Sequence, residues 1–485
     1  MDNPENKAPN EKGERKSPLE EFIAAPNRAM WRLATPMMLG MVVHMAYMIV
    51  DTAFIGLLGM EALAAATFVG PLFFFIIALL SGLAMAATAL VAQALGRKDH
   101  EAADRTAGGV MFVSILGGMG FTVILFIAGP HILRVFGAHG ESERLAWSYF
   151  RLISFGMILF FLSSAFRAVL TGEGDTRTPV IVMIIASFIN GGLDPVFMFV
   201  LDMGIAGAAM ATLTAQVFST LALGYIILVR RRSVVKVKLK HLRAYKPLFR
   251  GIVTIGLPTT IGQLVMSAGL ALNNRLLAHF GEFAVAAYGA ASKVDMIVAM
   301  PLFGLAGASV SLIGMFAGAG RSDLVRHTTL YVYRWALFIS VSVGVSAFLA
   351  SHWVLNLFTN DPVVIQTGRI YLGFMVFVYP MMAFGMTTGR ILQGLGYGMP
   401  SLIITSVRIL VVGVPIAYTA VLAFGAPLES VWWSILLGGV ISNVLSFLWV
   451  KKLVWREDPT IRAGAAPTIP AATPLGPEVN PVSDL

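Results

Sequence analysis

The stretch that decides the fold is Pro71–Leu95, PLFFFIIALLSGLAMAATALVAQAL, which holds no Asp, Glu, Lys or Arg. A helix needs about 20 apolar residues to cross the hydrocarbon core of a bilayer. Similar runs return at Val110–Ile127 and Leu402–Leu422. Spanning helices satisfy their own backbone hydrogen bonds, and the short alternating segments of a membrane β-barrel are absent. The pattern therefore predicts transmembrane helices.

The composition agrees, because 57% of the 485 residues are hydrophobic and 13% are charged, against about 25% charged residues in soluble domains. The predicted fold is an all-α polytopic membrane protein with twelve transmembrane helices. The expected spans cover residues 30–57, 62–94, 107–130, 146–170, 179–201, 204–229, 251–280, 286–319, 329–355, 368–395, 401–424 and 428–450.

The placement of Lys and Arg predicts the orientation of these spans. Most basic residues fall in the connections that the span count puts on one side, and Lys and Arg mark the cytoplasmic side. We therefore expect a multi-pass protein of the inner (plasma) membrane with both termini in the cytoplasm. The densest basic run, residues 230–250, could suggest nucleic acid, but it joins two spans, so we expect no nucleic-acid partner.

Other bulk features exclude several classes of protein. The chain has no cysteine, which excludes disulfides, thiolate metal sites and a cysteine nucleophile. Residues 1–29 are polar and lack the apolar core of a cleaved signal peptide. The tail from Asp458 to Leu485 is rich in Pro and Ala and is predicted to be disordered.

The sequence contains an internal repeat with an offset of 222 residues. Four landmarks of the first two spans recur at that offset, pairing Pro36, Asp51, Gly59 and Gly82 with Pro258, Asn273, Gly281 and Gly304. Such repeats form transporters whose halves rock about a central site. We expect two pseudo-symmetric six-helix lobes around a central cavity. The predicted segments are an N-terminal segment (1–29), two lobes (30–229 and 251–450), a basic linker (230–250) and a cytoplasmic tail (451–485).

Charged residues inside a membrane are costly and are candidates for function. Asp51 lies in the first span, with Tyr47 and His44 on the same helical face, and Asp194 lies in the fifth, one turn after Asn190. With Thr212 of the sixth span, these groups offer hard oxygen ligands for a small cation. Two close carboxylates would also share a proton. Either behaviour could couple an ion to transport; the alternative is hydrogen bonding within the bundle.

Three stretches together resemble the multidrug and toxic compound extrusion (MATE) family: LATP at 33–36, VDTAFIG at 50–56 and RAVLTGEGDTRTP at 167–179. The resemblance covers nearly the whole membrane region. It implies twelve helices in two lobes and export of organic, often cationic compounds in exchange for H⁺ or Na⁺.

The resemblance is strongest to the DinF-like branch, and it implies roles for individual residues. The first-lobe cation site of that branch matches Asp51, Asn190, Asp194 and Thr212. A bending proline matches Pro36, and two network tyrosines match Tyr47 and Tyr149. In that branch, protonation of the span 1 Asp is proposed to bend the helix and shrink the cavity.

The second lobe departs from another branch, the NorM-like one, which places a Glu in span 7 and an Asp in span 10. Span 7 here offers Gln263, Asn273 and Asn274, and residues 368–389 hold no carboxylate. Lys293 and Asp295 of span 8 point in different directions on a helix, so each is open to a structural pair with another span or to an ion or substrate role. His44 is open to packing or to proton carriage.

The leading hypothesis is a secondary active efflux antiporter, with H⁺ or Na⁺ as coupling ion and no other cofactor. We expect an organic cation as substrate, membrane lipids as surroundings and a monomer. A lipid-linked oligosaccharide flippase of the same fold superfamily is the alternative. An enzyme is disfavoured: the two Asp residues could in principle form an aspartyl dyad, but Asp194 is followed by Pro195 and no metal-ligand His pair at helical spacing appears. A passive channel would not need carboxylates in one lobe only.

Overall fold

The computed structural model describes residues 18–460 apart from 136, 138, 231–232 and 244, and the described chain is helical without a strand. Eleven helices are long and apolar enough to cross a membrane, or twelve if one bent pair is a single span. The prediction of an all-α polytopic membrane protein is confirmed. Residues 1–17 and most of the tail, including its predicted disorder, lie outside the described residues.

The helices of the first half follow one another with short connections. They are α1 (Leu19–Ala24), α2 (Pro26–Leu57), α3 (Met60–Gly96), α4 (His100–Val135), α5 (Gly140–Phe155), α6 (Met157–Gly172), α7 (Arg177–Pro195), η1 (Val196–Val200), α8 (Ile205–Gly224) and η2 (Tyr225–Val229).

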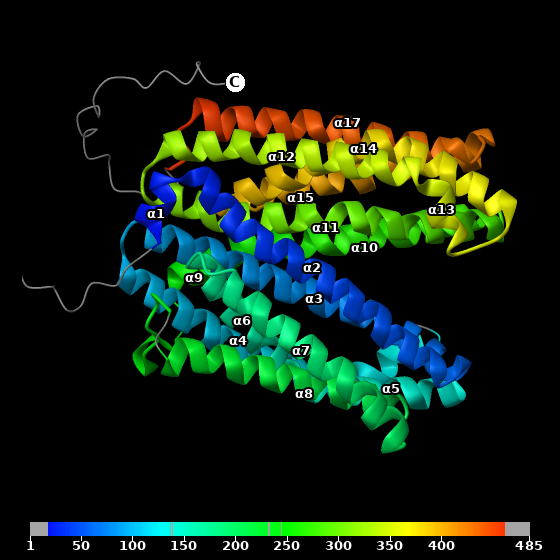
Figure 1. Cartoon of the computed structure of the whole chain (residues 1–485), viewed down its shortest axis with the longest axis horizontal. Coiled ribbons are helices and arrows are strands. Elements are labelled where there is room, and N and C mark those ends of the chain that lie inside the picture. Colours follow the sequence, from blue (N-terminus) through cyan, green and yellow to red (C-terminus); the bar gives the residue numbers. More distant parts are fainter. Residues whose placement is uncertain (1–17, 136, 138, 231–232, 244, 461–485) are drawn as a thin grey trace, which may run out of the picture.

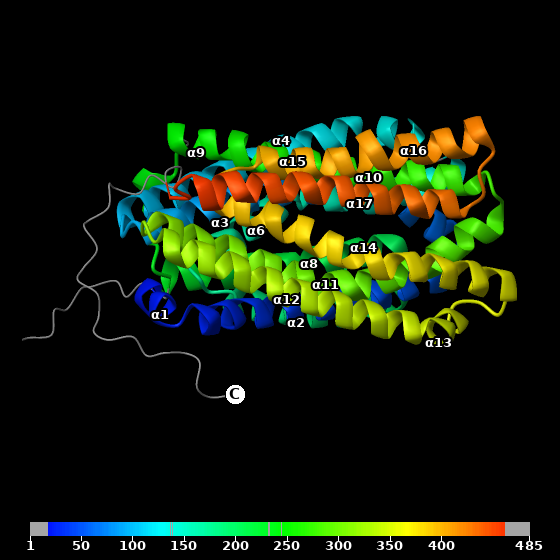
Figure 2. The ribbon, with the colours of Figure 1, turned by 90° about the horizontal axis from the view of Figure 1, so that it is seen from above.

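The second half repeats this order after a short linker that contains η3 (Leu239–His241) and α9 (Lys246–Gly251). Its elements are η4 (Ile252–Gly256), α10 (Leu257–Ala278), α11 (Glu282–Gly318), α12 (Ser322–Leu349), α13 (Ser351–Asn356), α14 (Pro362–Gly394), α15 (Met399–Ser406), η5 (Val407–Gly413), α16 (Val414–Tyr418), η6 (Thr419–Ala423), α17 (Glu429–Val450) and η7 (Lys451–Arg456). The long helices run side by side along one axis, with α1 and α9 at one end and α13 at the other (Figures 1 and 2).

The predicted span 146–170 is not one straight helix. It consists of α5 and α6, which meet at Gly156 with a bend of 51°. A Cβ atom at Gly156 would lie 2.1 Å from the Leu213 side chain of α8, so only a residue without a side chain lets the bend pack so closely there. The periodicity of apolar residues does not reveal such a bend, because both pieces are apolar.

The repeat is visible in the backbone itself. Gly59 precedes α3 with a φ of 107°, and Gly281 precedes α11 with a φ of 110°. A positive φ of this size favours glycine, because other residues lack the steric freedom to adopt it. Two glycines 222 residues apart therefore begin equivalent helices with the same turn.

The two halves meet most closely where α3 and α11 cross. A Cβ atom at Gly96 would lie 2.2 Å from the carbonyl oxygen of Met315, and one at Gly318 would lie 2.2 Å from that of Gln93. Gln93 and Met315 are themselves related by the 222-residue offset. The contact is therefore reciprocal, and it brings two backbones together at the end where α3 and α11 finish.

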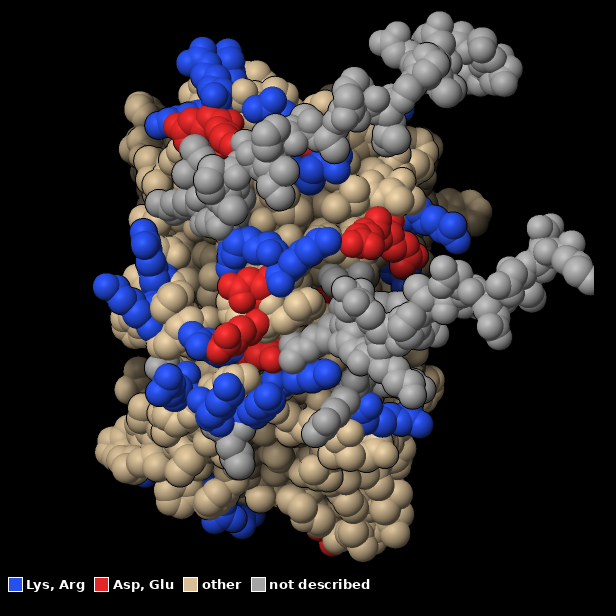
Figure 3. All heavy atoms as spheres, turned by 90° about the vertical axis from the view of Figure 1, so that its left-hand side faces the viewer, with Lys and Arg blue, Asp and Glu red and all other residues tan. Residues whose placement is uncertain are grey.

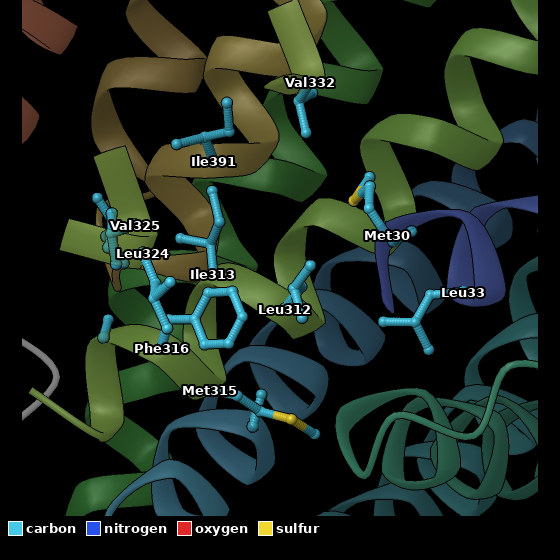
Figure 4. Packing of buried hydrophobic residues seen from close by; sticks show 14 of the residues in the cluster. Met30, Leu33, Leu312, Ile313, Met315, Phe316, Leu324, Val325, Val332 and Ile391 are labelled. Atoms are coloured by element: carbon cyan, nitrogen blue, oxygen red, sulfur yellow. The ribbon is translucent and has the colours of Figure 1, made fainter. Parts of the chain in front are cut away.

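Apolar packing adds α2 to this contact between the halves. Met30 and Leu33 of α2 belong to the same buried cluster as Leu312 and Phe316 of α11 (Figure 4). Helix α2 therefore contacts the second half as well as its own, a position that matters for the site described below.

We predict that Gly96→Ala and Gly318→Ala each destabilise the protein, because the added methyl group would meet a backbone carbonyl that cannot rotate away. Overpacking of this kind costs about 1–3 kcal/mol. Thermal unfolding of the purified protein in detergent should show a clearly lower Tm for both variants. Gly120→Ala is the matched control, since no atom lies within 4 Å of a Cβ there. Equal Tm values for all three would show that the crossing is loosely packed.

Candidate functional site

The four residues predicted for cation coupling lie on three neighbouring helices of the first half, α2, α7 and α8. Helix α7 packs against α2 on one side and against α8 on the other. The approach of α2 is close at Gly40, where a Cβ atom would lie 2.9 Å from the Met183 side chain and 3.2 Å from that of Val180. This close contact brings the polar face of α2 toward the polar face of α7.

The centre of the site is a pair of carboxyl groups from different helices. The carboxyl groups of Asp51 of α2 and Asp194 of α7 interact with each other. The Asp194 side chain is completely buried, and its Oδ1 atom has no donor among the described residues. Two carboxyl groups form a hydrogen bond only when a proton lies between them, since both are otherwise acceptors. The arrangement thus fits one shared proton, or a cation in its place.

Asn190 joins this pair to the neighbouring helices. In the amide orientation that satisfies its neighbours, its nitrogen donates to Tyr47 Oη (3.1 Å) and Asp194 Oδ2 (3.1 Å). Its oxygen accepts from the backbone N–H of Thr212 (2.9 Å). Tyr47 and Thr212 are also hydrogen-bond partners. The network therefore spans α2, α7 and α8, and it contains all four residues predicted for cation coupling.

Tyr149 of α5 borders the same network. It is almost fully buried, its ring lies 6.1 Å from that of Phe73, and it interacts electrostatically with Asp51 and Asp194. A phenol beside two acidic groups supplies a neutral donor without adding a charge. The network role that the family resemblance implies for Tyr149 stays a prediction.

Two prolines flank the site along the chain. Pro36 lies inside α2, and Pro195 ends α7 one residue after Asp194. Proline removes a backbone donor from the helical ladder. After Pro195 the chain continues as the wide turn η1, a local distortion often found at functional sites. Asp51 and Asp194 therefore each lie on a helix that lacks one backbone hydrogen bond.

His44 lies beside the network rather than within it. Its side chain is exposed, and its ring centre lies 6.0 Å from that of Tyr47. It also interacts with the charge of Arg167. Nothing in this geometry bonds it to the carboxyl pair, so its role as a proton carrier stays a prediction.

The second half holds its own buried acid, Asp295 of α11. Its carboxyl group accepts hydrogen bonds from Tyr371 Oη (2.6 Å) and Tyr379 Oη (2.7 Å), both of α14. The side chain of Lys293 is exposed instead. From the sequence alone we looked for a carboxylate in span 10, which corresponds to α14, and did not consider the two tyrosines of that helix. Their spacing of eight residues, which places both on one helical face, was the available signal.

The first-half network combines two carboxyl groups, one amide and one hydroxyl from three helices. Among the described residues, no three acidic or histidine side chains gather into a metal-binding group. The oxygen atoms of the network are of the kind that binds a small cation.

A model of the protein family described as MatE matches residues 36–196 and again residues 258–419. The chain belongs to the MATE family. The double match also agrees with the internal repeat. The recognition made from the three sequence stretches is confirmed, whereas the choice of the DinF-like branch remains a proposal.

Relatives agree with this membership over most of their length. A probable multidrug resistance protein NorM from Thermotoga maritima is 27% identical over 90% of this chain and 95% of its own. The multidrug export protein MepA of Staphylococcus aureus is 26% identical over 88% of this chain and 94% of its own. A solved outward-facing multidrug resistance MATE transporter of the MOP superfamily is 31% identical over 88% of this chain and 96% of its own, with a TM-score of 0.84. This MATE protein is therefore a multi-pass membrane transporter.

We predict that Asn190→Ala lowers the initial rate of dye efflux from reconstituted vesicles about tenfold, because it removes a hydrogen bond to a charged group. Ser187→Ala is the matched control on the same helix. The Ser187 hydroxyl bonds only to the Met183 carbonyl, 3.0 Å away, so its loss should leave efflux unchanged. Equal rates for both variants would remove Asn190 from the coupling network.

Proposed function

We propose that this MATE protein is a monomeric antiporter that exports organic, often cationic compounds in exchange for H⁺, with coupling at Asp51 and Asp194. The observation that carries the proposal is the contact between these two carboxyl groups, which come from different helices. One relative is named a multidrug export protein and another a probable multidrug resistance protein, and these names support the substrate class proposed here.

The proposal rests on the energy of two like charges in an apolar surrounding. Removing the shared proton leaves two carboxylates side by side, and their repulsion is strong where the dielectric constant is low. The pair then favours either separation of α2 from α7 or capture of a cationic substrate. Binding of a proton and binding of an organic cation thus compete for the same negative charge, which is the requirement for antiport.

Helix α2 is well placed to pass this change to the other half. It contacts α7 at the carboxyl pair and α11 of the second half. Pro36 lies within the part of α2 that packs on α11, before the contact with α7 at Gly40, and it removes one backbone hydrogen bond there. A change at Asp51 can therefore bend α2 and alter its packing on α11. The same coupling is proposed for the DinF-like branch, to which we assign this chain.

Asn190 favours H⁺ over Na⁺ as the coupling ion. A sodium site built from Asp51, Asn190, Asp194 and Thr212 would need the amide oxygen to face the ion. We assign the amide with its nitrogen toward Asp194 and its oxygen toward the Thr212 backbone N–H, because this orientation satisfies the neighbouring groups. In this orientation the amide acts as a donor to a carboxylate, which suits a proton-sharing pair better than a metal ion.

Transport would use the two halves as moving units. We propose that residues 30–229 and 251–450 rock against each other about the α3–α11 crossing, connected by the linker 230–250. Both termini are proposed to be cytoplasmic, because Lys and Arg are concentrated on the connections of that side. The crossing at Gly96 and Gly318 would then close the cytoplasmic side.

The flippase alternative requires a basic surface for phosphate groups in the transport path. Of the second-half cations that could supply it, Arg275 and Lys293 have exposed side chains and Arg408 is half-buried, whereas the two acids that meet each other, Asp51 and Asp194, lie in the first half. This distribution supports a cationic substrate.

We predict that Asp51→Asn and Asp194→Asn each reduce dye efflux driven by a pH gradient to the rate of protein-free vesicles. Either change leaves one carboxyl group, which no longer experiences the repulsion that drives proton uptake by the pair. Efflux from vesicles should be followed under a pH gradient alone and then under a Na⁺ gradient alone.

Asp202→Asn is the matched control, because Asp202 is an exposed acid in the connection after η1. It should retain wild-type efflux. Wild-type efflux driven by Na⁺ alone would contradict the choice of H⁺. Unchanged pH-driven efflux in Asp51→Asn would remove the carboxyl pair from the mechanism.

We also predict the side on which α5 begins. Because the chain has no natural cysteine, Ser142→Cys creates a single labelling site. A membrane-impermeant maleimide should label it in intact cells, whereas Arg456→Cys should react only after permeabilisation. The reverse pattern would invert the proposed orientation, and with it the direction of transport.

A further inference from the structure

A polar cavity of about 270 Å³ lies outside the predicted spans, where α4 begins and the linker follows η2. It is far along the chain from the carboxyl pair and is not part of the transport site. Its lining residues are Glu101, Arg105, Lys240, His241, Arg243 and Tyr245. Figure 3 faces the end of the molecule that bears this linker, and Lys and Arg side chains are spread across it.

The shape of the cavity is fixed because hydrogen bonds attach the linker to α4. The backbone N–H of Lys236 donates to Asp104 Oδ1 (2.7 Å), and Tyr245 Oη and Thr106 Oγ1 form a hydrogen bond of 2.7 Å. These two contacts lie on either side of the cavity-lining residues 240–243. An irregular segment of the chain is thereby held in one position over the start of α4.

A buried carboxylate fastens the same segment further upstream. Glu173, in the turn after α6, accepts from the Ser233 hydroxyl and from the backbone N–H groups of Val234 (3.0 Å) and Val235 (3.1 Å). Burial raises the pKa of Glu173 to about 7, partly offset by these hydrogen bonds. Three donors on one carboxylate fix the linker before it reaches the cavity.

The charge of the cavity favours an anion. Arg105, Lys240 and Arg243 contribute three cationic side chains, against one carboxylate from Glu101. Glu101 is already engaged by Arg105 at 2.5 Å. Lys240 and Arg243 have exposed side chains, and guanidinium and ammonium groups in this combination are the usual partners of phosphate.

His241 supplies a further donor. Its Nδ1 atom accepts from the backbone N–H of Lys238 at 3.4 Å, so its proton lies on Nε2. The ring is 5% exposed, and Nε2 has no acceptor among the described residues. A buried donor without an acceptor is costly, and an anion bound in the cavity would relieve part of that cost.

The residues next to the cavity are of the types that proteins place at a membrane surface. Helix α9 begins directly after Tyr245, and it exposes Lys246, Phe249 and Arg250, with 65% of Phe249 accessible. Aromatic and basic side chains together are typical of the region where lipid headgroups meet water. A soluble anion would gain nothing from Phe249, whereas a lipid would use both features.

We propose that this cavity binds the phosphate of an anionic phospholipid headgroup, with the acyl chains lying along the apolar surface beside α9. The proposal rests on the placement of the spans under the proposed function, but not on the carboxyl pair or on the coupling ion. The bound lipid would attach the linker to the bilayer surface and so hold the connection between the two moving halves.

The test measures binding to the full-length purified protein in a neutral detergent. The probes are dioctanoyl phosphatidylglycerol, dioctanoyl phosphatidylcholine and inorganic phosphate, and native mass spectrometry counts the bound molecules. The anionic lipid should bind more tightly than both other probes. The double variant K240Q/R243Q should weaken its binding about tenfold or more, as expected for the loss of two surface cations.

The matched control is K451Q/K452Q, which removes two exposed cations outside the cavity. This variant should bind the anionic lipid as the wild type does. Equal weakening in both double variants would show a diffuse charge effect and overturn the proposal, as would equal binding of the zwitterionic lipid. Tight binding of inorganic phosphate that displaces the lipid would assign the cavity to a soluble anion instead.

The binding result is independent of transport. Asp51→Asn should bind the anionic lipid with wild-type affinity, whether or not it exports dye. Loss of lipid binding in K240Q/R243Q, with a Tm equal to that of the wild type, would separate a lost site from a misfolded protein.

Discussion

The structure depends on holding two carboxyl groups together inside an apolar helix bundle. Asp51 and Asp194 come from helices in which hydrophobic residues predominate, and the Asp194 side chain is completely buried. Two unshared negative charges at such a place would strongly repel each other, because little water is present to screen them. A proton between them removes one charge and supplies the missing hydrogen bond. In the mechanism we propose, the site is stable in one protonation state and strained in the other, and this difference lets an ion control helix packing.

The rest of the fold places one acid of this carboxyl pair on a helix that also contacts the second half. Gly40 lets α2 approach α7 closely, and the reciprocal glycines Gly96 and Gly318 bring the two halves into backbone contact. Helix α2 takes part in both the carboxyl site and the interface between the halves. The second half shares the scaffold but has Asn273 where the first has Asp51. The asymmetry of charge on a symmetric scaffold explains why coupling is assigned to one half only.

Features carried along a single helix could be predicted from the sequence. Apolar runs predicted the spans, and the 222-residue offset predicted equivalent turns such as those at Gly59 and Gly281. The one-turn spacing of Asn190 and Asp194 placed both on one face. Features that depend on contacts between helices could not be predicted, because the period of a helix does not say which neighbour its face meets. The bend at Gly156 and the two tyrosines that bind Asp295 belong to this second kind.

The central claim is that Asp51 and Asp194 share one exchangeable proton, and infrared difference spectroscopy of the reconstituted protein tests it most directly. Spectra recorded at acidic and alkaline pH should show a carbonyl band of a protonated carboxyl group that disappears as the pH rises. The account predicts that this band is missing or strongly shifted in both Asp51→Asn and Asp194→Asn, and unchanged in Asp202→Asn. An unchanged band in both site variants would contradict the shared proton.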